Sequence, residues 1–176
     1  NAANDIKKNT PIMVAIGNPP YSGESSNKGD WIMKEMEAYK REPSGGKLQE
    51  KNSKWINDDY VKFMRMGEYY IEKNGEGVLA YITNHSYLDN PTFRGVRYHL
   101  MQTFDDIYIL DLHGNSLKKE ISPDGTQDKN VFDIQQGVSI ILAIKKQSKK
   151  SDLAKIYHFD LYGNRDEKFE WLTKNT

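Results

Sequence analysis

The residues of this chain with the clearest chemical potential form one short segment, Asn18, Pro19, Pro20 and Tyr21. An apolar run and a glycine, which permits a turn or the close approach of a ligand, precede it. The two prolines fix φ and remove two backbone N–H donors, so the carbonyls of residues 18 and 19 lie in a stiff stretch. An amide oxygen beside a fixed carbonyl can accept both hydrogens of an NH₂ group, and a tyrosine ring can stack on a planar ring. The segment therefore predicts a pocket wall for a planar aromatic amine.

Asn-Pro-Pro-Tyr after an apolar strand resembles the catalytic motif of amino methyltransferases that use S-adenosylmethionine, above all the adenine-specific DNA methyltransferases. Further blocks, in the same order, are similar to that family at residues 77–87, 94–100, 106–115 and 130–140. Their combination looks most like the large restriction-modification polypeptides, of type IIG or single-polypeptide type I, that fuse methyltransferase, nuclease and translocase parts. The resemblance extends from about residue 11 to the C-terminus.

This resemblance implies a function and assigns residues to it. The chain would belong to a DNA methyltransferase that moves a methyl group from S-adenosylmethionine to the exocyclic amino group of adenine, after the base has flipped out of the duplex. The catalytic residues would be Asn18, Pro19, Pro20 and Tyr21. Contacts to the target base would come from Tyr21, Phe132, Thr83 and Asn84.

The sequence also departs from the family. It has no counterpart of the glycine-rich loop that grips the cofactor, nor of the acidic residue that holds the ribose, and Asn18 is the one candidate for a cofactor contact. We therefore expect a partial Rossmann-like methyltransferase fold of the α/β class, with a mostly parallel sheet and an antiparallel last strand pair. We also expect the chain alone to bind S-adenosylmethionine weakly or not at all, and to be inactive.

The expected organisation is a flexible lead-in at residues 1–10, the target-base half of the catalytic domain at residues 11–150, and a strand-helix extension of that domain at residues 151–176. The implied partners are double-stranded DNA, a cofactor-binding half that precedes this chain, and a target-recognition domain that follows it. No base-reading domain is present in this sequence.

Composition limits the class of protein. The chain has 176 residues, of which 37% are hydrophobic and 28% charged, which is ordinary for a globular domain with a core. Lysine plus arginine equals aspartate plus glutamate at 25 each, so DNA binding must come from local patches or from other parts of a larger protein. The absence of cysteine excludes disulfides and thiolate metal sites and is typical of a prokaryotic cytoplasm. No apolar stretch is long enough for a membrane span, so no membrane partner is expected.

Hydrophobic periodicity predicts the elements that must position these residues. Strands are expected at residues 12–16, 78–82, 107–112, 138–144 and 155–162, and helices at residues 31–41, 58–73, 91–104 and 167–174. Asp30 and Asn57 are the expected caps of the first two helices. The alternation of strands and helices predicts a parallel sheet up to residue 112. Because no crossover helix precedes the strand at residues 138–144, that strand should run antiparallel to its predecessor.

Three polar strand endings should meet at one edge of the sheet, since ligands bind at the carboxyl ends of parallel strands. These endings are Asn18, residues 83–85 and residues 111–115. The first strand reads as buried on both faces, yet in the family's strand order it would border the missing strands and form an apolar edge. We expect residues 1–10 or a second copy of the chain to cover that edge. The polar residues 43–54 should form an exposed, mobile excursion.

Several polar residues have plain structural explanations. His85 and His113 are expected to be loop or supporting residues, and we assign no metal role because the histidines lack ligand spacing. Arg94 and Arg97 fit phosphate contacts and a solvated helix face equally well. Phe132 fits a packing role as well as the second aromatic contact.

Two other functions remain open from the sequence. The same tetrapeptide occurs in methyltransferases that modify a glutamine side chain of a protein, although the insertion at residues 22–56 and the block at residues 112–115 speak against that reading. The second alternative is a catalytically silent DNA-binding or scaffolding module that keeps the fold.

Overall fold

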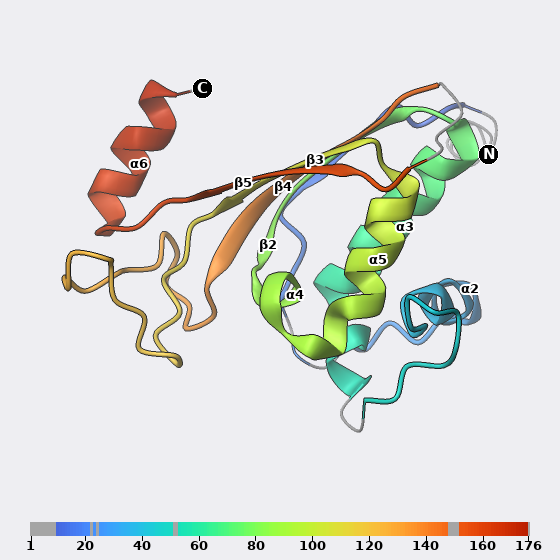
Figure 1. The fold of residues 1–176 in the computed structure, drawn as a ribbon, viewed down its shortest axis with the longest axis horizontal. Coiled ribbons are helices and arrows are strands. Elements are labelled where there is room, and N and C mark those ends of the chain that lie inside the picture. The colour runs from blue at the N-terminus through green and yellow to red at the C-terminus, as the bar shows by residue number, and fades with distance from the viewer. Residues whose placement is uncertain (1–9, 22, 24, 51–52, 148–151, 176) are drawn as a thin grey trace.

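The computed structural model describes residues 10–21, 23, 25–50, 53–147 and 152–175. Within these residues the chain forms one five-stranded sheet (Figure 1). Its strands are β1 (Val14–Gly17), β2 (Gly77–Asn84), β3 (Asp106–Asp111), β4 (Val138–Lys145) and β5 (Lys155–Asp160). The expected lead-in at residues 1–9 lies outside the described part of the chain.

The strand order is β1-β2-β4-β3-β5. β1 pairs with β2 and β3 pairs with β5 in parallel, whereas β4 lies between β2 and β3 and is antiparallel to both. The α/β class and the mostly parallel sheet are therefore confirmed, and so is the antiparallel direction of β4. Because β1, β2 and β3 run the same way, their carboxyl ends share one edge, which we call the rim.

Most helices cover one face of the sheet, and α6 lies on the other side (Figure 1). The first group comprises α2 (Asp30–Glu35), η1 (Met36–Ala38), η2 (Ser53–Asn57), α3 (Asp59–Asn74), α4 (Ser86–Asp89), η3 (Pro91–Phe93) and α5 (Arg94–Thr103), while α6 spans Arg165–Lys174. The predicted caps are each off by one position: Gly29 caps α2 and Asp58 caps α3. No described helix is long and apolar enough to cross a membrane.

The main core lies between the sheet and α3, α5 and η1. The side chains of β2 alternate, so that Leu79 and Tyr81 are buried beneath the helices while their neighbours are less covered. Met64 and Ile71 of α3 face them and are completely buried. At roughly 25 cal/mol for each Å² of apolar surface removed from water, this layer supplies most of the drive to fold.

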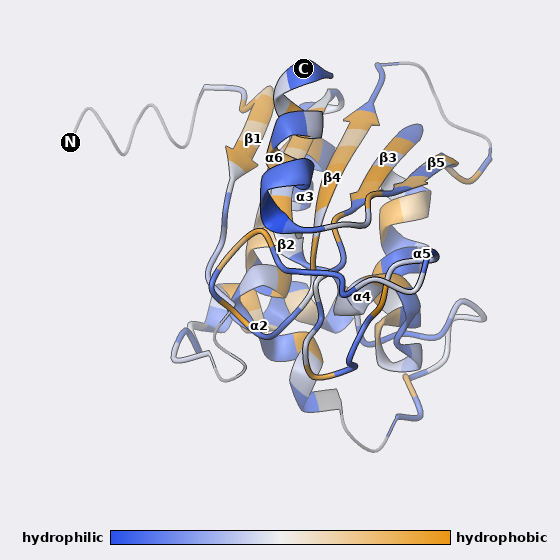
Figure 2. Ribbon diagram, turned by 90° about the vertical axis from the view of Figure 1, so that its left-hand side faces the viewer, coloured by the Kyte–Doolittle hydropathy of each residue, from blue (hydrophilic) through white to orange (hydrophobic). Residues whose placement is uncertain are grey.

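β1 departs from the expectation of a strand buried on both faces. Val14 is 56% exposed and Ile16 is 79% exposed, because within the described residues β1 has a neighbouring strand on one side only and no helix covers these two side chains. The apolar edge expected from the strand order is therefore confirmed. Figure 2 looks onto this face of the sheet, whose strands are largely hydrophobic around α6. What covers the edge stays a prediction, since residues 1–9 are outside the described part.

Residues 43–50 of the expected excursion are more anchored than expected. Leu48 is buried, and its backbone N–H donates to the carbonyl of Lys40. Arg94 of α5 forms ion pairs with Glu42 at 2.5 Å and Glu50 at 2.6 Å. The guanidinium group of Arg94 is therefore paired with carboxylates of this chain. Arg97 likewise donates to the backbone carbonyls of Tyr87 and Asn90.

A buried charged network joins the helices of the main layer. Glu68 is fully buried and accepts hydrogen bonds from the Tyr39 hydroxyl at 2.8 Å and from Arg65 at 3.0 Å, and its other oxygen lies 3.0 Å from His99 Nδ1. Burial disfavours the charged forms of Glu68 and His99. Their mutual hydrogen bond and attraction outweigh that effect, so the pKa of Glu68 is lowered and the pKa of His99 is raised.

These opposite shifts predict a stability optimum in mildly acidic solution. The raised pKa of His99 gives a contribution that is complete below the ordinary value of 6.5 and is lost as pH rises through the folded value. The lowered pKa of Glu68 gives a contribution that is complete above 4.5 and is lost as pH falls through its folded value. The free energy of unfolding, measured by denaturant titration across pH, should therefore peak between these limits.

The variant His99→Gln should flatten the decline on the alkaline side of that profile. His158→Gln is the matched control, because this histidine is exposed on β5. An unchanged alkaline slope in His99→Gln would contradict the assignment.

Candidate functional site

The segment Asn18 to Tyr21 leaves the carboxyl end of β1 at the rim. Asn18 is exposed, Pro19 is buried and Tyr21 is half-buried. The Tyr21 hydroxyl lies 2.8 Å from Asn18 Oδ1 and 3.1 Å from the carbonyl oxygen of Ile82. Burial raises the pKa of Tyr21 to about 12, so the hydroxyl keeps its proton and donates.

This contact fixes the orientation of the Asn18 amide. A hydroxyl that donates to Oδ1 requires the oxygen to face Tyr21, and an amide oxygen keeps a second lone pair for another donor. The ring of Tyr21 meets Tyr60 edge-on, with centroids 6.2 Å apart and planes at 85°. Tyr21 therefore orients Asn18 and packs against the core, which adds to the stacking role expected from the sequence.

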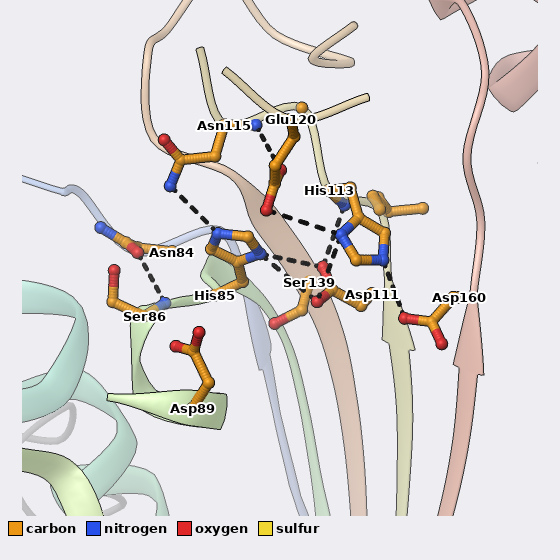
Figure 3. Close-up of polar contacts among 12 residues, drawn as sticks. Asn84, His85, Ser86, Asp89, Asp111, His113, Asn115, Glu120, Ser139 and Asp160 are labelled. Atoms are coloured by element: carbon orange, nitrogen blue, oxygen red, sulfur yellow. Dashed lines mark hydrogen bonds and ion pairs between the residues drawn. The ribbon is translucent and has the colours of Figure 1, made fainter. Parts of the chain in front are cut away.

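A second polar cluster joins the carboxyl ends of β2 and β3 (Figure 3). His85 Nδ1 lies 3.0 Å from Asp111 Oδ1, and His85 Nε2 lies 3.2 Å from the side-chain nitrogen of Asn115. His113 Nε2 lies 2.8 Å from Asp160 Oδ1, and the backbone N–H of His113 donates to Asp111 at 2.9 Å. The rim predicted from the strand order thus gathers residues 83–85 and 111–115.

The hydrogen bonds of this cluster define its protonation. Asn115 Oδ1 accepts from the backbone N–H of Lys118, so its NH₂ group faces His85 Nε2, which must accept. His85 therefore carries its proton on Nδ1 and donates it to Asp111. Although burial opposes it, the hydrogen bonds from His85 and from the His113 backbone lower the pKa of Asp111, which stays a carboxylate.

In this arrangement His85 Nδ1 is not free to bind a metal ion, because it donates to Asp111. Donor atoms of His85, Asp111 and His113 lie within 4.8 Å of one another, which is close enough for ligands of one ion. A metal on His85 Nδ1 would require a proton on Nε2, which would then face the NH₂ group of Asn115. As described, the cluster is a hydrogen-bonded network at the rim, and the supporting roles expected for the two histidines stay a prediction.

A cavity of about 480 Å³ opens beside the cluster on the helical side of the sheet. Its floor is apolar, with Leu100, Ile107 and Ile141, and its wall includes Asp160 and His158. Neither Asn18 nor Tyr21 lines it. Asn18 is exposed, and its side-chain partner among the described residues is the Tyr21 hydroxyl.

Phe132 lies on the connection between β3 and β4. It is half-buried and packs against the apolar cluster of Leu112, Val131, Val138 and Leu161, and Tyr21 packs against the same cluster. The structure therefore brings the two aromatic residues expected at the target base to a common support.

Thr83 and Asn84 are less available. Thr83 is fully buried, and the Asn84 side-chain oxygen accepts from the backbone N–H of Ser86 at the start of α4. The hydrogen bond of Asn84 stabilises the turn after β2, and both side chains expose little surface to a ligand.

Sequence reasoning missed how His85 is embedded. Its partners Asp111 and Asn115 are 26 and 30 positions away, and Gly137 packs directly on its ring. The only sequence signal was a polar residue at the end of each strand. It predicts that these side chains lie at the same edge of the sheet, but not which of them are hydrogen-bonded to each other.

The comparisons with known proteins agree with this architecture. A family model described as Eco57I restriction-modification methylase matches residues 2–117. The ATP-dependent Type ISP restriction-modification enzyme LlaBIII bound to DNA is 28% identical, with a TM-score of 0.82, and the match covers 98% of this chain and 12% of that one. No curated protein matches this chain.

Two further solved structures share the fold. A DrdV–DNA complex is 26% identical, with a TM-score of 0.77, over 100% of this chain and 17% of that one. A nuclease-deletion mutant of the Type ISP enzyme LlaGI in complex with a DNA substrate mimic is 23% identical, with a TM-score of 0.77, over 98% and 17%. The chain thus spans less than a fifth of each of these proteins.

The packing of Gly137 on His85 yields a test of the rim. A Cβ at position 137 would lie 2.4 Å from two atoms of the buried, hydrogen-bonded imidazole ring, which cannot move aside without losing its partners. Gly137→Ala should lower the free energy of unfolding by about 1 to 3 kcal/mol, measured by denaturant titration. Gly46→Ala, where a Cβ meets nothing within 4 Å, is the control and should change it by less than about 0.5 kcal/mol. Equal stability of the two variants would refute this packing.

Proposed function

Because the chain belongs to the Eco57I restriction-modification methylase family, we propose that it forms the target-base side of a DNA methyltransferase within a restriction-modification enzyme. The full enzyme would transfer a methyl group from S-adenosylmethionine to the exocyclic nitrogen of adenine. The observation that carries the proposal is the exposed Asn18 amide at the rim, with its oxygen oriented by the Tyr21 hydroxyl at 2.8 Å.

The proposed chemistry follows from the electronic structure of the amine. The lone pair of an exocyclic amine is delocalised into the purine ring, which makes the nitrogen a poor nucleophile. If Asn18 Oδ1 and the carbonyl of Pro19 each accept one hydrogen of the NH₂ group, the nitrogen becomes pyramidal and its lone pair is freed. Aligned acceptors also stabilise the positive charge that develops on the nitrogen, at about 2 to 4 kcal/mol each by analogy with a single oxyanion-hole donor.

The aromatic residues suit a base that has left the duplex. Adenine is stacked and paired in DNA, so its amine reaches Asn18 only after flipping. Tyr21 and Phe132 rest on one apolar cluster and are both half-buried, which leaves part of each ring available. They would hold the base against the Asn18 acceptor.

The described residues do not by themselves fit S-adenosylmethionine. β1 is followed directly by Asn18 and two prolines, and no glycine-rich turn lies at its carboxyl end. The cofactor, which supplies an electrophilic methyl group when bound, would therefore occupy a site formed largely by other parts of the polypeptide. The exposed edge of β1, with Val14 and Ile16, is a suitable junction for that cofactor-binding half.

The two alternatives fit less well. The family that this chain matches is a restriction-modification methylase, which favours DNA over a protein as the substrate. A silent scaffold would have no need for an amide oriented by a hydroxyl at an exposed rim.

Substitution of Asn18 tests the proposed function directly. In the full-length enzyme, Asn18→Ala should lower the rate of DNA methylation on the order of 100- to 1000-fold and leave DNA affinity nearly unchanged, because the acceptor acts on the transition state. Tyr21→Phe keeps the ring but frees the amide, and a smaller loss on the order of tenfold is expected. Asn175→Ala, at the end of α6, is the control. Wild-type methylation by Asn18→Ala, measured as radiolabel transfer to DNA, would exclude the proposal.

The open edge of β1 gives a second test. The isolated chain should bind S-adenosylmethionine weakly or not at all in a calorimetric titration, and the edge should favour self-association in size-exclusion chromatography. Micromolar affinity for the cofactor in the isolated chain would overturn the assignment of the site to other parts of the polypeptide.

A further inference from the structure

The connection between β3 and β4 is long and irregular, and it carries Phe132. We call residues 113–137 the target-base loop. Apart from an isolated bridge between Ile121 and Gln127, it has neither helix nor strand. A loop of this length cannot hold an aromatic side chain in place through its own backbone ladder, so other contacts must fix it.

Several of those contacts come from α6, on the opposite side of the sheet from the main helical layer (Figure 1). Lys168 of α6 is completely buried. Its ammonium group donates to the carbonyls of Leu112 and Lys129 at 2.7 Å each and pairs with Asp128 Oδ1 at 2.8 Å. All three N–H donors therefore have acceptors, one before the target-base loop and two within it.

Asp128 completes this arrangement from inside the loop. It is also buried, and its side-chain oxygens accept backbone N–H donors from Gly114 at 2.6 Å and Gly163 at 2.8 Å. Gly114 has a left-handed φ of 80°, and a Cβ there would meet the backbone of Asn130 at 2.3 Å. The Lys168–Asp128 pair thus joins the start of the loop, its later part and the turn before α6.

The same helix reaches the neighbours of Phe132. Arg165 donates to the carbonyl of Asn130 at 3.1 Å and pairs with Asp133 at 2.6 Å. The Asn130 side chain donates to the carbonyls of Gly114 and Gln136 and accepts the backbone N–H of Phe132 at 2.9 Å. Phe132 is therefore bracketed by residues that α6 holds.

A buried ion pair is weak support for stability, because desolvation of both charges opposes their attraction. Such a pair is better explained by a need to fix one arrangement. Here every donor of Lys168 has a partner. Two of these partners lie in the loop that carries Phe132, and the third directly precedes it.

We propose that Lys168 is a positioning residue of the methyltransferase, and that through its contacts to Asp128 and the loop carbonyls it sets the place of Phe132 against the flipped base. This inference rests on the proposed function. It adds that the strand-helix extension, which bears neither the Asn18 segment nor Phe132, is needed for the geometry of the base pocket.

The test uses the full-length enzyme and a double-mutant cycle. The methylated adenine is first located in genomic DNA of cells that express the enzyme, and a duplex with 2-aminopurine at that position then reports the environment of the base. Lys168→Met and Phe132→Ala should each lower single-turnover methylation by about 10- to 100-fold, as expected for a displaced positioning group. Both should change the 2-aminopurine fluorescence in the same direction, while the affinity for S-adenosylmethionine stays within about twofold of wild type.

The double variant Lys168→Met/Phe132→Ala should be no slower than Phe132→Ala alone, because Lys168 acts through Phe132. Lys174→Met, an exposed lysine of the same helix, is the matched control and should behave as wild type. If Lys168→Met does not fold, Arg165→Ala, whose side chain is 39% exposed, replaces it under the same criterion.

The inference would be overturned if the losses of methylation rate in the two single variants multiplied in the double variant. It would also be overturned if Lys168→Met lost affinity for S-adenosylmethionine, because a general structural role predicts that loss. The proposed function fails separately, when the wild-type enzyme leaves no methylated adenine in DNA or when Asn18→Ala methylates normally.

Discussion

The candidate site depends on one hydrogen bond, from the Tyr21 hydroxyl to the Asn18 amide oxygen. It sets which end of the amide faces the tyrosine. Pro19 and Pro20, which lie between the two residues, stiffen the segment that holds them together. The same hydroxyl lies near the carbonyl of Ile82, so the turn is tied to β2 as well as to β1. An acceptor that is oriented before its ligand arrives needs little reorganisation when the ligand binds.

Two supports surround this turn, one on each side of the sheet. On the helical side, the His85–Asp111 pair and Asn115 connect the ends of β2 and β3. On the other side, the Lys168–Asp128 pair connects α6 to the connection that carries Phe132. Tyr21 packs against the cores of both sides. Each of these two pairs has several further hydrogen-bond partners, so both favour a single arrangement of the rim.

Much of this was readable from sequence, and the reasons for the misses are physical. The alternation of elements predicted the fold class and the shared rim, because strand direction follows from the connections. The burial of β1 was predicted wrongly, because an apolar run such as residues 12–16 does not reveal which neighbours cover it. The partners of His85 and Lys168 were missed, because they are distant in sequence and a lysine on a mostly charged helix reads as solvated.

A structure of the full-length enzyme with its DNA substrate would test the central claim most directly, through the distance from the target amine to Asn18 Oδ1. The account predicts the exocyclic nitrogen of a flipped adenine within about 3.2 Å of that oxygen and of the Pro19 carbonyl. An amine held elsewhere, for example in the cavity beside His85, with Asn18 left facing solvent, would contradict it.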